Sequence, residues 1–278
     1  GDYNVGLGDD ALTATTSGHS NTANGYKALA ANTTANNNTA IGRHSLLTNT
    51  TGADNTAVGR DSMRMNLTGS SNVGIGYETL YANTSGAYNV ALGALALDAN
   101  TTGARNTATG HSALTANTTG NYNTASGFDT LKANTTGTGN VAIGRDSLMT
   151  NTTASNNTAV GYASLQLNTT GYHNTAVGKS ALEDNTTGYY NAAFGYHALK
   201  LNTTGLQNSA FGYEALYSNT SGNYNIALGI TALGANTTGN NNVGIGKLAL
   251  TNNTTASDNT AVGYRSLAAN TTGAGATA

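Results

Sequence analysis

The side chains that could carry acid–base or metal chemistry are few and scattered. The chain contains five histidines, thirteen aspartates and glutamates, and no cysteine. A catalytic or metal centre needs several such groups to converge on one point. The histidines, at His19, His44, His111, His173 and His197, follow no ligand spacing, and no pair of carboxylates recurs. We therefore expect no catalytic, cofactor-binding or metal site, no cofactor and no enzymatic activity.

A repeated unit carries all these groups. Seventeen residues, shown cleanly by NTAIGRHSLLTNTTGAD at Asn38 to Asp54, recur without insertion or deletion from Asn4 to Gly275. The sixteen copies each begin with an Asn, which we number position 1 of the repeat. Such a short fixed period predicts an array of stacked units rather than ordinary globular domains. We expect a single continuous array over residues 1–278.

Some positions of the repeat are fixed and others vary freely. Position 1 is always Asn and position 5 always Gly, while position 9 is Leu except at Met63. Position 12 is Asn in every copy but the first, position 13 is Thr except at Leu67, and position 14 is Thr or Ser. Position 15 is Gly or Ala. Most acidic residues, with His44 and His197, occupy the variable positions 7 and 10.

The fixed positions predict strands and turns. Positions 1 to 5 alternate: position 2 is Val, Ile, Thr, Ala or Ser, and position 4 is apolar except at Asn24, Thr109 and Ser126. This alternation is typical of a strand. Gly at position 5 would end it by allowing a left-handed or strained turn. Positions 8 and 9 suggest a second short extended segment. Asn-Thr-Thr-Gly at positions 12 to 15 suggests a corner.

These signals favour an all-β fold, a parallel β-solenoid with one repeat per coil. Helices are disfavoured because Gly, Asn, Thr and Ser weaken them, and known helical repeats are about 33 to 47 residues long. About sixteen coils, stacked about 4.8 Å apart, would span about 75 Å. Identical residues would then stack, so Asn at positions 1 and 12 could form amide ladders. Leu at position 9 would form a continuous apolar spine.

Position 3 is always Ala or Gly, which leaves two interpretations. If positions 2 and 4 face the interior, position 3 forms a flat outward strip against which another chain could pack, and three chains could associate about a long axis. Alternatively, position 3 is itself interior and too crowded for larger side chains. The sequence does not decide between them.

The composition excludes several partners. The net charge is −2, the pI is about 6.2 and basic residues do not cluster, so we expect no nucleic-acid or anionic-membrane binding. No run approaches eighteen apolar residues, so we expect no membrane span, and no charged-then-apolar leader is present. Because the chain starts and stops inside a repeat, we expect it to be a piece of something longer.

The segments NTAVG, NVAIG and NSAFG, at Asn55 to Gly59, Asn140 to Gly144 and Asn208 to Gly212, resemble the SVAIG-type unit of trimeric autotransporter adhesin heads. The full unit is also similar to repeats of bacteriophage tail-fibre and bacterial surface-fibre proteins. This resemblance covers essentially the whole chain, although the period of 17 is longer than the adhesin-head unit. It implies a left-handed β-roll, trimerisation and a place outside the cell, on the cell surface or on a virion.

Two surface motifs leave alternatives open. Tyr recurs at position 6 (Tyr26, Tyr77, Tyr162, Tyr196, Tyr213, Tyr264) and at position 17 (Tyr3, Tyr88, Tyr122, Tyr190, Tyr224). These rows could stack on the sugar rings of cell-surface glycans, or could pack between coils or chains, which we favour. Asn-Thr-Thr is formally a glycosylation sequon, but a stacked Asn explains position 12 without any enzyme.

Three functions compete. The first is a structural or adhesive extracellular fibre, a tail-fibre shaft, surface adhesin or filament, whose subunits form a homotrimer or stack end to end through open solenoid edges. The second is an ice-binding solenoid, suggested by Thr at positions 13 and 14, although adjacent residues of an extended segment point to opposite sides. The third, a polysaccharide-active solenoid enzyme, needs a break in the pattern, and none exists. We favour the fibre.

Overall fold

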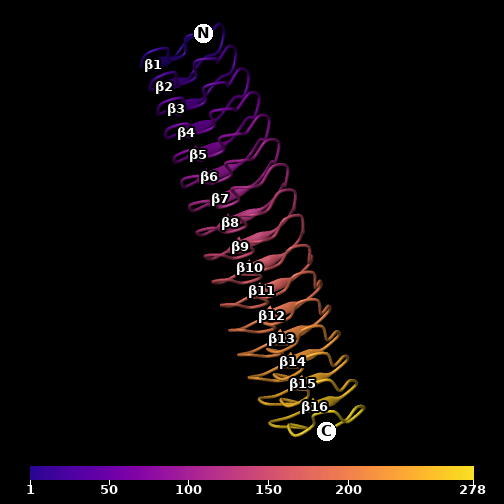
Figure 1. Ribbon diagram of the computed structural model, residues 1–278. Helices are drawn as coiled ribbons and strands as arrows, with labels where there is room; N and C mark the ends of the chain where they lie inside the picture. The colour runs from indigo at the N-terminus through magenta and orange to yellow at the C-terminus, as the bar shows by residue number, and fades with distance from the viewer. The chain divides into compact units, whose positions relative to one another are not determined.

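The computed structural model describes all 278 residues. They form two compact units, Gly1–Gly139 and Asn140–Ala278, each built from the same repeat. Within each unit the chain winds in successive coils, and one short strand of each coil lies beside the strand of the next (Figure 1). The regular elements are all strands, so no helix is long and apolar enough to cross a membrane.

Every copy of the repeat contributes one strand of three residues at positions 2 to 4. The strands of the first unit are β1 (Val5–Leu7), β2 (Thr22–Asn24), β3 (Thr39–Ile41), β4 (Thr56–Val58), β5 (Val73–Ile75), β6 (Val90–Leu92), β7 (Thr107–Thr109) and β8 (Thr124–Ser126). Those of the second unit are β9 (Val141–Ile143), β10 (Thr158–Val160), β11 (Thr175–Val177), β12 (Ala192–Phe194), β13 (Ser209–Phe211), β14 (Ile226–Leu228), β15 (Val243–Ile245) and β16 (Thr260–Val262).

Strand pairing follows the repeat. Neighbouring strands are parallel, and each residue pairs with the residue one repeat later, as Thr39 does with Thr56 and Ala40 with Ala57. The prediction of a parallel β-solenoid with one seventeen-residue repeat per coil is confirmed. Because the offset equals the repeat, identical positions stack on each other along the coils.

Outside the strand, each coil also forms regular backbone hydrogen bonds with the coils before and after it. In the coil that begins at Asn174, backbone N–H groups donate to carbonyls of the following coil at positions 2, 9, 11 and 13: Thr175 to Asn191, Leu182 to Ala198, Asp184 to Lys200 and Thr186 to Thr203, at 2.8 to 3.0 Å. The following coil donates back, from Gly195 to the Val177 carbonyl at 2.8 Å and from His197 to the Lys179 carbonyl at 3.1 Å. Coil-to-coil bonds therefore run round the whole circumference.

Position 3 faces the interior, which decides between the two interpretations of its Ala and Gly residues. Ala40, Ala57 and Ala159 are fully buried, whereas the flanking positions 2 and 4 are half-buried or exposed. A Cβ atom on Gly74 would lie only 2.9 Å from Ser62 Oγ and 3.0 Å from Met63 Cε, so the interior is crowded there. The outward strip at position 3, and the argument for chain association built on it, are therefore wrong.

Positions 6 to 11 form turns, so the prediction of a second extended segment at positions 8 and 9 is also wrong. The leucines of position 9 have left-handed backbones, with a φ of 50° at both Leu29 and Leu46. This conformation costs an L-residue about 1 to 2 kcal/mol. Two features offset the cost: the Leu29 N–H donates to the Ser45 carbonyl of the next coil at 3.1 Å, and the side chain is fully buried.

The spine and the amide ladders form the core. The position 9 residues from Leu29 to Leu250, Met63 included, are fully buried in fourteen successive coils. Asn residues of positions 1 and 12 are buried beside them and bond from coil to coil, as predicted. Gly at position 5 ends every strand with a φ between 123° and 141°, which confirms its predicted role.

Candidate functional site

The structure brings two of the five histidines close to carboxylates. His44 and His197 lie at position 7, and the residue one repeat later at position 7 is acidic in both cases, Asp61 and Glu214. Sequence reasoning placed these residues at the same position but missed that they pair. The seventeen-residue offset between each His and its acid was the signal that could have shown it.

The first of these clusters is centred on Asp61. His44 Nδ1 lies 3.1 Å from Asp61 Oδ1, and both side chains are about nine-tenths buried. Arg60 Nε lies 3.4 Å from Asp61 Oδ2, and Arg64 Nη1 lies 3.5 Å from Asp61 Oδ1. Two guanidinium groups therefore lie beside one carboxylate.

A carboxylate that orients a histidine is part of many hydrolytic sites, where the histidine activates a nucleophile. The nearest serine in the repeat, Ser45, points elsewhere: its hydroxyl is fully buried and donates to the Ala57 carbonyl at 3.0 Å. The ring of Tyr26 lies against His44, with centroids 5.4 Å apart. In this cluster the His44–Asp61 contact joins two successive coils, whereas both arginines belong to the same coil as Asp61.

The second cluster joins positions 7 and 10 of the coils around His197. His197 Nδ1 lies 3.9 Å from Glu214 Oε1, and Lys200 Nζ lies 3.5 Å from Glu183 Oε2. Burial lowers the pKa of His197, and the charge of Lys200 adds to the effect. Burial likewise raises the pKa of Asp184, with help from the charge of Glu183. The His197–Glu214 and Lys200–Glu183 contacts each join residues of successive coils, so this cluster also links coils.

Position 6 forms a row of aromatic and basic side chains. Tyr196 and Tyr213 are stacked in successive coils, with ring centroids 5.2 Å apart and planes 11° from parallel. Lys179 Nζ lies 5.8 Å from the ring centroid of Tyr162 and 5.6 Å from that of Tyr196. Arg60 covers Tyr77, with its guanidinium carbon 4.4 Å from the ring centroid. The ring faces thus contact neighbouring coils, and stacking and cation–π contacts of this kind are stabilising.

This geometry bears on the two interpretations of the tyrosine rows. Sugars stack on the face of an aromatic ring, yet Tyr196 lies between Lys179 of the preceding coil and Tyr213 of the following coil. A second stack at position 16, Tyr172 on Tyr189, has centroids 4.9 Å apart and planes 3° from parallel. Packing between coils is therefore the interpretation that these contacts favour, with the ring edges left at the surface.

The Asn-Thr-Thr corner is also committed to internal contacts. The Asn49 amide donates to Asn32 Oδ1 at 3.3 Å and to the Gly52 carbonyl at 2.9 Å, and the residue is fully buried. Thr50 Oγ1 donates to the carbonyl of Leu67 in the next coil at 3.0 Å. A glycan on Asn49 would have to displace this ladder, so the stacked Asn accounts for the sequon in the folded chain.

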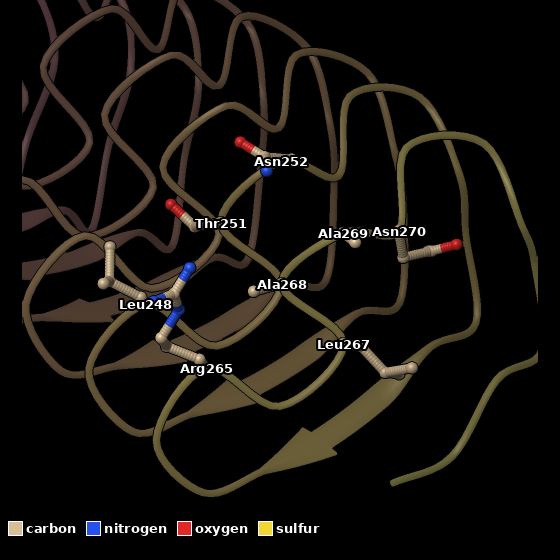
Figure 2. A pocket seen from close by; sticks show the side chains of 8 residues that line it. All are labelled: Leu248, Thr251, Asn252, Arg265, Leu267, Ala268, Ala269 and Asn270. Atoms are coloured by element: carbon tan, nitrogen blue, oxygen red, sulfur yellow. The ribbon is translucent and has the colours of Figure 1, made fainter.

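A surface depression lies on the last two coils (Figure 2). Its lining is Leu248, Thr251, Asn252, Arg265, Leu267, Ala268, Ala269 and Asn270. Arg265 points toward Leu248 and Thr251 in Figure 2 and is the one charged side chain of the lining. The other lining residues are Leu, Ala, Thr and Asn, none of which is an ordinary acid–base group.

Comparison with known proteins adds no candidate. The chain matches no known protein family model and no curated protein. Its chemistry therefore has to be inferred from the geometry described above.

Proposed function

We propose that this chain is a segment of a structural or adhesive extracellular fibre, of the kind found in tail-fibre shafts, surface adhesins and filaments. The observation that carries the proposal is the bonding between coils. Strand, turns and corner each bond the following coil, and bonds of the same kind recur in most copies. A stack of this kind can be lengthened by adding copies, because each coil needs only its neighbours.

The charged side chains support a structural role rather than an enzymatic one. The paired residues bridge successive coils, as His44 does with Asp61 and Lys200 with Glu183, or lie within one coil, as Lys132 and Asp129 do at 3.0 Å. Enzyme sites instead direct such groups towards a bound substrate. An adhesive fibre would meet cell-surface glycans or a host receptor with its exposed tyrosine edges, such as Tyr122 and Tyr224.

Ice binding receives less support from the Thr positions. Thr33 at position 13 is half-buried, and its hydroxyl donates to the Thr50 carbonyl of the next coil at 3.2 Å. Thr34 at position 14 is exposed. One exposed row does not provide the flat face of two threonine rows that the hypothesis needs. Thermal hysteresis in solutions of the purified protein would restore it.

Length variation tests the fibre proposal. We would duplicate residues 140–275, which adds eight copies of the repeat, and measure both proteins by small-angle X-ray scattering. The maximum dimension should increase by about 38 Å, since coils stack about 4.8 Å apart, while the cross-section stays unchanged. A larger cross-section without greater length would contradict the proposal.

A further inference from the structure

The outer face of the second unit's sheet, formed by positions 2 and 4 of β9 to β16, carries no charge and is half-buried or exposed. Position 4 is apolar in all eight strands: Ile143, Val160, Val177, Phe194, Phe211, Leu228, Ile245 and Val262. Half of this row is exposed, as Ile143 is at 43 % and Leu228 at 48 %, and the other half is half-buried. Phe194 stacks on Phe211 with centroids 4.8 Å apart. We call this surface the apolar sheet face.

Charge is absent from this face although charged residues surround it. Positions 2 and 4 of the second unit carry only Val, Thr, Ala, Ser, Ile, Phe and Leu. Positions 6, 7 and 10, by contrast, hold Arg145, Lys179, Glu183, Lys200 and Glu214. Positions that stay in contact with water usually include charged residues. A charge-free, largely apolar stripe therefore indicates an interaction surface.

Exposed apolar side chains elsewhere in the chain also concentrate at the sheet. All but four of the large exposed ones lie at positions 17, 2, 4 and 6, the four exceptions being Met65, Leu67, Leu167 and Tyr172. Tyr190 and Tyr224 at position 17 and Tyr162 and Tyr213 at position 6 therefore border the apolar sheet face in the second unit. Aromatic residues at the border of an apolar centre are typical of protein–protein interfaces.

The period and the area of the face indicate its partner. A surface that repeats with every coil is matched along its whole length only by a surface with the same period, and a second copy of this chain provides one. Eight coils about 4.8 Å apart and a strand segment of four steps of about 3.3 Å give about 500 Å² per copy. Two such faces would bury about 1,000 Å², which reaches the lower limit of specific interfaces, and the bordering tyrosines add to it.

We propose that the apolar sheet face packs against the same face of a second copy of this chain, aligned coil to coil. The proposal rests on the fibre function above and names the surface through which its chains associate. Sheets packed in this way lie about 10 Å apart with interleaved side chains. Burial of the position 4 row supplies the driving force.

Cysteine cross-linking tests the contact directly, because the chain has no cysteine of its own. Val177→Cys places a thiol at position 4 of β11, and Thr187→Cys places one at the exposed position 14 of the same copy as a matched control. Under mild oxidation of the purified full chain, Val177→Cys should form disulfide-linked dimers in much higher yield than Thr187→Cys. Equal yields would overturn the proposal.

Variants that place charges on the apolar sheet face test the association through the mass of the protein in solution. The wild-type chain should have a solution mass that is a multiple of 27.9 kDa in light scattering. Val177→Glu combined with Phe211→Glu should reduce it to 27.9 kDa, while Thr187→Glu with Ser221→Glu, in the same two copies, should not. Circular dichroism checks the fold, and if the Glu pair unfolds the chain, the cysteine yields decide.

Monomeric wild-type protein, or assembly that survives both glutamates in a folded chain, would refute the packing. The fibre proposal fails separately. A monomer that still lengthens with added copies leaves the fibre standing without this interface, whereas a protein that does not lengthen removes the fibre itself.

Discussion

Asn83 donates a side-chain hydrogen bond to Oδ1 of Asn66, seventeen residues earlier, at 2.6 Å. Its amide also donates to the Gly86 carbonyl at 3.0 Å, and its own Oδ1 accepts from Asn100 at 2.8 Å. All three asparagines are fully buried. One side chain thus bonds three coils and holds the corner of its own coil.

Replacement of Asn83 by Ala should therefore destabilise the chain strongly. It leaves the Asn66 carbonyl oxygen and the Asn100 amide each without one partner, and buried groups left unsatisfied cost about 1 to 3 kcal/mol. We expect a loss of about 3 kcal/mol in the free energy of unfolding, measured by denaturant titration. Ser85→Ala, at the exposed position 14 of the same copy, should stay within about 0.5 kcal/mol. Comparable losses in both variants would contradict the ladder's role.

Substitutions at two glycines of position 5 can distinguish the cost of backbone strain from the cost of steric overlap. Gly161 and Gly263 have nearly the same φ, 133° and 129°. A Cβ atom on Gly161 would lie 2.6 Å from the Gly178 carbonyl oxygen, whereas one on Gly263 would have no atom within 4 Å. Strain alone costs about 1 to 3 kcal/mol, and the overpacking adds about 1 to 3 kcal/mol. Gly161→Ala should thus lower the unfolding free energy by clearly more than Gly263→Ala, and equal losses would mean that only strain matters.

Thr231 is a position where glycine should be an improvement. It is β-branched yet has a left-handed backbone with φ of 52°. Relief of about 1 to 2 kcal/mol of strain exceeds the entropic cost of glycine, about 0.5 to 1 kcal/mol, so Thr231→Gly should stabilise the chain by about 0.5 kcal/mol or more. Asn241, with φ of 55°, is the control, because Asn tolerates this conformation and its amide bonds Asp258 at 3.1 Å. Asn241→Gly should give no gain in the melting temperature.

Asp98 makes stability depend on pH in an unusual direction. Burial, and then the charge of Glu78, raise the pKa of Asp98 above its ordinary value of 3.8. The folded chain therefore holds this proton more tightly than the unfolded chain does. Its stabilising contribution is complete below about pH 3.8 and is lost as the pH rises through the higher folded-state pKa.

Asp98→Asn should remove this dependence. At pH 7 we expect a gain of about 0.5 kcal/mol, kept small by solvent at the half-exposed group, and a flatter profile of unfolding free energy just above pH 3.8. Asp146→Asn is the control: Asp146 pairs with Arg145 Nε at 3.1 Å, so the substitution should give no gain. If both variants gained unfolding free energy, the change in net charge, and not the raised pKa of Asp98, would explain the result.

The stacking architecture was predictable because it follows from the period alone. With one copy per coil, Asn must meet Asn and Leu must meet Leu, whatever the path of the chain between them. The path itself was harder to predict. Leu is a poor candidate for a left-handed residue, so nothing in the type of Leu29 or Leu46 indicated the turns at positions 6 to 11.

The face of the strand that points to the interior was hard to predict for a related physical reason. Alternation shows that positions 2 and 4 share one side of the strand, but it leaves open which side faces the interior. The interior is already filled by Leu46 and Ser45, which leaves room only for Ala40 there. The ion pairs could have been found, since His44 and Asp61 differ by one repeat.

The asparagine and leucine ladders are the same in nearly every coil, so they cannot tell one coil from another. A chain that skipped a whole copy while folding would keep both ladders intact. The varied side chains at the surface can make that distinction, because contacts such as Arg60 on Tyr77 or Lys200 with Glu183 form only between particular neighbours. Sequence variation at the outer positions thus makes each pair of neighbouring coils distinct. A chain with identical repeats would lack these contacts, and its coils could pair in a shifted register.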